Sequence, residues 1–184
     1  MTRGFTLLEI VVAMAIAVII LTALSSIFIV QYNLYFLGST SVDLNSSLTA
    51  TLRAMEEFGT SARAIVNTRD FGGTNFTTSN TTLVLALPSV DPGGNPLPQT
   101  DYVVFFRDPV QGQKLWMQID ADATSSRRDL TKLFSDLTNI LQFSYNKSNP
   151  AEATIVEVFV SLRKVAKGNP QETSGRTSIF LRNK

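Results

Sequence analysis

One acidic residue, Glu9, stands at the start of the most apolar part of the sequence. From Ile10 to Val30, 18 of 21 residues are Ala, Val, Ile, Leu, Met or Phe. A carboxylate at the centre of a membrane-spanning helix costs about 2.5–3.5 kcal/mol, so such an acid indicates a functional role with a cation as its expected partner. The alternative is that Glu9 lies near enough to the end of the apolar run to reach the lipid headgroups.

The rest of the sequence offers few groups for catalysis or metal binding. It contains no Cys and no His, which excludes thiol nucleophiles, Ser-His-Asp triads, and zinc sites built on Cys or His. Asp120 and Asp122, followed by Thr124 and Ser125, could supply oxygen ligands to Ca²⁺. They do not match an EF-hand, and a solvated acidic loop is the favoured interpretation. We therefore expect no metal, no cofactor and no enzymatic activity.

The basic residues are dispersed, with two small clusters. The 16 Lys and Arg nearly balance the 15 Asp and Glu, so the formal net charge of +1 does not indicate a nucleic-acid partner for the chain as a whole. Arg127 and Arg128 form one cluster, and Arg163, Lys164 and Lys167 form the other. Arg127 and Arg128 are candidate contacts to DNA phosphates, with a solvated surface or a subunit contact as the favoured alternative.

A long helix must position Glu9. The apolar run has the length of a bilayer core, roughly 30 Å at 1.5 Å per residue, and no Gly lies between Gly4 and Gly38. Beyond it, apolar residues continue at three- and four-residue steps to about residue 66, which predicts an amphipathic continuation of the same helix.

The residues around Glu9 carry a specific resemblance. The sequence Arg3-Gly4-Phe5-Thr6-Leu7-Leu8-Glu9-Ile10 and the apolar run behind it closely resemble the type IV prepilin signal of pilins and of type II secretion pseudopilins. The resemblance implies a leader, residues 1–4, that a prepilin peptidase cuts between Gly4 and Phe5. It further implies N-methylation of Phe5 and an assembly role for Glu9, whose carboxylate would pair with the terminal amine of a neighbouring subunit.

The remaining chain predicts an α+β fold. Short β-type runs at residues 82–87, 101–107, 114–119, 139–145, 154–162 and 176–181 follow the helix, which favours an antiparallel sheet packed on it. Residues 67–80 are predicted to form a loop, and residues 126–134 a short helix or irregular crossover. The expected organisation is a leader (1–4), a transmembrane and filament-core helix (5–30), its amphipathic continuation (31–66) and an extracytoplasmic head (67–184).

The order of these elements also looks like that of minor pilins and minor pseudopilins of the W and J types. This resemblance implies a structural subunit of a type IV pilus, a competence pilus or a type II secretion pseudopilus, which initiates assembly at the tip. Its implied partners are prepilin peptidase, other minor and major subunits and the inner-membrane assembly platform. The alternative is a membrane-anchored or secreted binding or enzymatic domain behind an ordinary secretory signal.

Overall fold

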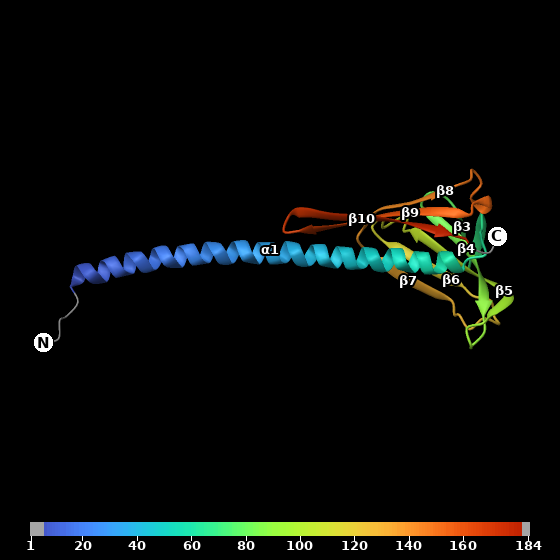
Figure 1. The fold of residues 1–184 in the computed structure, drawn as a ribbon, viewed down its shortest axis with the longest axis horizontal. Coiled ribbons are helices and arrows are strands. Elements are labelled where there is room, and N and C mark those ends of the chain that lie inside the picture. Colours follow the sequence, from blue (N-terminus) through green and yellow to red (C-terminus); the bar gives the residue numbers. More distant parts are fainter. Residues whose placement is uncertain (1–5, 182–184) are drawn as a thin grey trace. The chain divides into compact units, whose positions relative to one another are not determined.

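The structure is a computed structural model that describes residues 6–181 (Figure 1). Its first element is one long helix, α1 (Leu7–Ser61). The chain divides into two compact units, Met1–Thr40 and Ser41–Lys184. In the first unit, every side chain from Thr6 to Phe36 is exposed. An apolar helix without a buried face requires lipid or other helices around it.

The second unit combines the end of α1 with ten strands, so the predicted α+β class is confirmed. Five strands form a sheet in the order β1-β4-β5-β6-β7, three form a second sheet in the order β10-β9-β8, and β2 pairs with β3 alone. All pairings are antiparallel. The strands are β1 (Ala64–Ile65), β2 (Thr68–Phe71), β3 (Thr74–Thr77), β4 (Thr82–Val90), β5 (Pro96–Arg107), β6 (Leu115–Asp120), β7 (Leu130–Ser135), β8 (Thr138–Tyr145), β9 (Ile155–Ala166) and β10 (Asn169–Phe180).

A single main core joins the last turns of α1 to both larger sheets. Along β4 the side chains alternate: Leu83, Leu85 and Leu87 enter the main core, while Val84 enters a smaller cluster with Phe71. Both faces of this strand are therefore buried, which explains its continuous apolar sequence. The main core includes Leu44, Leu48 and Met55 of α1, Val103 and Phe105 of β5, Leu141 and Phe143 of β8, and Val158 and Val160 of β9.

The helix ends at Ser61, within residues 58–66, the region in which the sequence predicts its end. The backbone of the next residues pairs with β4 instead: Arg63 N donates to Ala86 O over 2.7 Å, and Val66 N donates to Val84 O over 3.0 Å. Val66 also packs on the smaller cluster. Its apolar side chain fits the helical spacing of the sequence, but the residue lies in an extended segment.

The predicted loop at residues 67–80 is wrong in part, because it contains the β2–β3 hairpin. Gly72 and Gly73 form its two-residue turn with φ of 62° and 96°, the left-handed conformation that such turns require. The Asp70 side chain accepts a hydrogen bond from Gly73 N at 2.8 Å. Phe71 and Phe76 pack edge to face, with 5.6 Å between ring centroids.

Two further expectations need correction. Residues 130–135 form the edge strand β7 and not the predicted short helix or crossover, because their backbone pairs with β6 from Ile119↔Leu130 to Leu115↔Ser135. The last strand begins at Asn169 and not near residue 176, because Lys167 and Gly168, with φ of 51° and 80°, form a tight turn between β9 and β10.

Candidate functional site

Glu9 lies in the first turn of α1 and caps the helix. Its Oε2 accepts hydrogen bonds from Thr6 N at 2.9 Å and Thr6 Oγ1 at 3.0 Å, and Glu9 N donates to Thr6 Oγ1 at 3.3 Å. This reciprocal pattern is a capping box, which satisfies backbone donors at a helix start. The predicted cleavage and methylation residues, Gly4 and Phe5, lie outside the described residues.

The helix that Glu9 caps suits a membrane. Within residues 6–181, α1 is the one helix long and apolar enough to span a bilayer. Its hydroxyl groups are satisfied locally: Thr22 Oγ1 donates to Ile19 O at 2.8 Å, and Ser25 Oγ donates to Leu21 O at 2.8 Å. Because these side chains return their hydroxyls to the helix backbone, they add no unpaired donor to an apolar environment.

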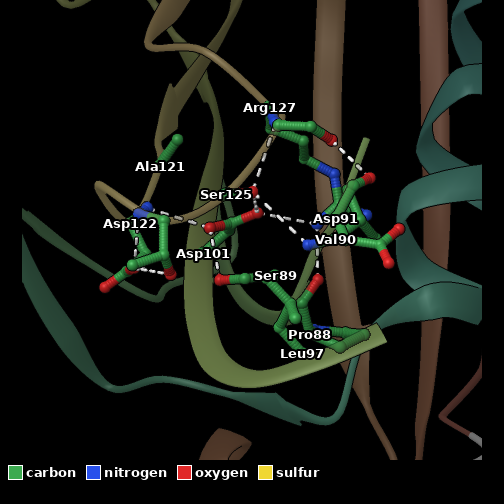
Figure 2. Close-up of polar contacts among 12 residues, drawn as sticks. Pro88, Ser89, Val90, Asp91, Leu97, Asp101, Ala121, Asp122, Ser125 and Arg127 are labelled. Atoms are coloured by element: carbon green, nitrogen blue, oxygen red, sulfur yellow. Dashed lines mark hydrogen bonds and ion pairs between the residues drawn. The ribbon is translucent and has the colours of Figure 1, made fainter. Parts of the chain in front are cut away.

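A second polar constellation surrounds Asp101 on β5, a fully buried carboxylate (Figure 2). Asp101 Oδ1 accepts hydrogen bonds from Ser89 Oγ at 2.7 Å and from Asp122 N at 2.9 Å. Asp101 Oδ2 accepts from Ser125 Oγ at 2.8 Å and from Arg127 Nη1 at 2.8 Å. The four donors lie on β4 and on the segment between β6 and β7, so the carboxylate fastens that segment to the sheet.

The hydrogen bonds keep Asp101 ionised despite its burial. Desolvation raises the pKa of the carboxyl, but the hydrogen bonds from Ser89, Asp122 N, Arg127 and Ser125 together outweigh it and leave the pKa below its ordinary value. Each oxygen of Asp101 accepts two hydrogen bonds. The geometry of the cluster is that of a structural tie.

The two candidate DNA contacts differ in their surroundings. The Arg127 guanidinium pairs with Asp101, and its Nη1 also donates to Pro88 O. Arg128 is exposed. Arg127 therefore has a structural task, and only Arg128 presents its charge to solvent in the way that a phosphate contact needs. DNA binding by either residue stays a prediction.

The two acidic residues that could supply ligands to Ca²⁺ are committed to local contacts. Asp120 pairs with Arg69 at 2.9 Å, and Asp122 Oδ1 accepts from Thr124 N at 2.9 Å. The neighbouring Asp129 is committed as well, because its Oδ1 accepts from Ala121 N at 2.8 Å. Over residues 6–181, no three His, Cys, Asp or Glu side chains gather as a metal site would require.

Comparison with known families adds one finding. The prokaryotic N-terminal methylation motif matches residues 1–25, the segment that contains Gly4, Phe5 and Glu9. The match supports a prepilin-type, pilin-like subunit, and it implies processing by a prepilin peptidase and assembly with other pilins. With the apolar helix, it is consistent with a single-pass anchor in the inner membrane. Neither the curated proteins nor the solved structures gave a match.

Sequence reasoning missed two features of these sites. The capping role of Thr6 could have been recognised, because Thr6-Leu7-Leu8-Glu9 is the Thr-x-x-Glu pattern that precedes many helices. The role of Asp101 had no such signal, because its partners are 12 to 26 positions away in the chain.

Proposed function

We propose that the chain is a structural, non-enzymatic minor subunit of a filament of the type IV pilus class: a pilus, a competence pilus or a type II secretion pseudopilus. The observation that carries this proposal is the methylation motif at residues 1–25. Within it, Glu9 stands at the start of a helix whose side chains are exposed from Leu7 to Phe36. Prepilin peptidase cuts after Gly4, and Phe5 becomes the N-methylated terminus.

Glu9 then acts in assembly. In a filament the apolar helices pack together and exclude water, so a carboxylate among them needs a cation. The terminal amine of a neighbouring Phe5 supplies one, and the pair fixes the axial position of an incoming subunit. The Thr6 contacts are compatible with this role, because both hydrogen bonds that Thr6 donates to the Glu9 carboxylate go to the same oxygen, Oε2.

The finer part of the proposal places this subunit at the filament tip with other minor subunits, on the assembly platform of the inner membrane. It is supported by the order of strands behind the helix and by the absence of Cys from the sequence, since many major pilins close their C-terminal region with a disulfide. The head is extracytoplasmic in this arrangement.

Processing gives the first test. The chain is expressed with and without a prepilin peptidase, and the mature N-terminus is determined by mass spectrometry. We expect N-methylated Phe5 in the presence of the peptidase and an intact leader in its absence. A terminus near Ser25, independent of the peptidase, would instead establish an ordinary secretory signal.

Two matched variants separate the charge of Glu9 from its capping role. Glu9→Gln removes the charge but keeps a side chain that can cap at this position, whereas Thr6→Ala removes the capping hydroxyl and keeps the charge. We expect Glu9→Gln to be processed yet depleted at least tenfold from sheared filaments, and Thr6→Ala to remain within about twofold of the parent. Parental incorporation of Glu9→Gln contradicts the ion-pair role.

A further inference from the structure

A basic cavity lies where the five-stranded and three-stranded sheets approach each other in the second unit. It has a volume of about 390 Å³, and its lining includes Arg107, Gln113, Thr138, Asn139, Arg163 and Lys164. Backbone hydrogen bonds hold its walls together: Thr138 N donates to Gln113 O at 2.8 Å, and Arg163 N donates to Leu137 O at 2.8 Å. The cavity is therefore built by the fold and does not depend on surface side chains alone.

Three cations from two segments of the chain line this cavity, and its lining contains no carboxylate. Arg107 ends β5, and its Nε donates to Gly112 O, which fixes the guanidinium at the cavity wall. Arg163 and Lys164 are consecutive residues of β9. They lie beyond Thr138↔Leu162, the first pair of β8 with β9, so this part of β9 has no β8 neighbour and is open to the cavity.

The nearest acidic groups compensate these cations in part. Glu172 lies opposite Arg163 in the β9–β10 pairing, and hydrogen bonds from Ser161 and Asn139, followed by the charge of Arg163, lower the pKa of Glu172. Asp43 meets Lys164 only at 4.0 Å, with both side chains substantially exposed. An exposed pair of this kind contributes little free energy, so Lys164 can turn to another anion at small cost.

A polar atom without a partner lies in the same wall. Thr138 is 1% exposed, and its Oγ1 makes no hydrogen bond within the part of the chain that the structure describes. Buried hydroxyls in native proteins nearly always have a partner. The register of β8 against β9 shifts between Thr138 and Ile140, so Thr138 lies at an irregular place in the sheet.

We propose that this cavity binds a phosphate group, as the monoester or diester of a small molecule. A carboxylate is satisfied by one bidentate arginine, whereas a phosphate group presents oxygens in several directions and suits a cavity lined by two guanidinium groups and an ammonium group. The cavity also has room for part of the esterified group, and a phosphate oxygen that reached the wall would give the Thr138 hydroxyl an acceptor.

The test titrates the full chain, in a neutral detergent and a phosphate-free buffer of low ionic strength, with inorganic phosphate and with glycerol 3-phosphate by calorimetry. We expect saturable binding of one equivalent. The Arg163→Ala/Lys164→Ala variant should weaken it at least tenfold, because it removes two of the three cations. Absence of binding to the parent chain overturns the proposal.

A charge-matched control removes two exposed cations elsewhere in the second unit, in the variant Lys132→Ala/Lys147→Ala. We expect its affinity for phosphate to stay within twofold of the parent, and equal weakening by both double variants would overturn a localised site. Fluorescence of the single Trp, Trp116, reports that each variant is folded. A second variant, Thr138→Val, keeps all three cations and should weaken binding by a smaller factor, about threefold.

The choice of ligand distinguishes the source of the phosphate. Preference for glycerol 3-phosphate, a monoester, indicates a soluble metabolite, and preference for glycerophosphoglycerol, a diester, indicates a phospholipid headgroup; either supports the proposal. Acetate that binds as tightly as phosphate contradicts it and indicates a carboxylate partner. Binding of a single-stranded oligonucleotide without any binding of the small esters also contradicts it and indicates an open nucleic-acid surface.

Discussion

Asp101 is the residue on which the segment between β6 and β7 depends. Its two oxygens gather a backbone amide, two hydroxyls and a guanidinium in a fully buried position. A buried charge of this kind is tolerated because every face of it is matched by a donor. Removing the Asp101 charge weakens all four hydrogen bonds, and removing one donor leaves part of the carboxylate buried without a partner.

We expect Asp101→Asn to lower the free energy of unfolding by about 3 kcal/mol, in the range measured for broken buried ion pairs. The new amide would face the Arg127 guanidinium with a second donor. Urea unfolding of the chain in a neutral detergent, followed by Trp116 fluorescence, measures the change. Arg128→Ala, an exposed neighbour of Arg127, is the control and should change stability by less than about 0.5 kcal/mol.

Asp101 also makes stability depend on pH. Its folded pKa lies below the ordinary value, which is about 3.9 in an unfolded chain. The stabilisation is therefore complete above about pH 5 and is lost as the pH falls through the folded pKa. Urea midpoints measured from pH 7 to pH 2.5 should show parent and Asp101→Asn converging at the acidic end, and a constant difference would contradict this sign.

At the scale of elements, the end of α1 and β10 approach so closely that only glycine fits. A Cβ added to Gly59 would lie 2.3 Å from Ile179 Cγ2, and one added to Gly175 would lie 2.8 Å from Leu52 Cδ1. These two glycines set the distance between the helix and the three-stranded sheet, and they bring Thr173 Oγ1 within 2.7 Å of Asn45 Oδ1.

Gly59→Ala tests this contact. Alanine favours a helix over glycine by about 1 kcal/mol, but the overlap with Ile179 costs typically 1–3 kcal/mol, so we expect a net loss of stability of about 1 kcal/mol. Gly38→Ala is the matched control within α1, because nothing lies within 4 Å of an added Cβ there. A gain in the urea midpoint for Gly59→Ala would show that the two elements can separate freely.

At the scale of the whole molecule, the two units differ in what surrounds their apolar side chains. The main core of the second unit is composed of residues between Leu44 and Leu181, whereas the apolar residues of the first unit are exposed from Leu7 to Phe36. The second unit therefore contains the apolar contacts that it needs to fold, and the first unit requires lipid or other subunits.

We expect a fragment of residues 41–184 to be soluble and to unfold cooperatively, while the full chain requires detergent. Gel filtration without detergent and thermal unfolding by circular dichroism measure this. Aggregation of the fragment, with no cooperative transition, would show that residues 1–40 contribute to its folding.

Several elements could be predicted from local sequence and others could not. The helix and the strands β4, β5, β6, β8 and β9 carry apolar runs of the right length, and their existence was predicted correctly although the ends of the strands were not. The β2–β3 hairpin was missed because Thr and Asn dominate it, although Gly72-Gly73 is a readable two-residue turn. β7 was missed because its side chains are mostly exposed, and an edge strand without a buried face shows no alternation.

The N-terminal features can be read from consecutive residues: the acid at Glu9, the apolar run behind it and the methylation motif at residues 1–25. Capping and membrane spanning depend on neighbouring residues, which is why a local pattern reveals them. The buried pair of Asp101 and Arg127 and the cavity that Arg107 lines with Arg163 and Lys164 became visible in the folded chain alone. Those groups are distant in sequence and meet because two sheets close over one core, which no local pattern encodes.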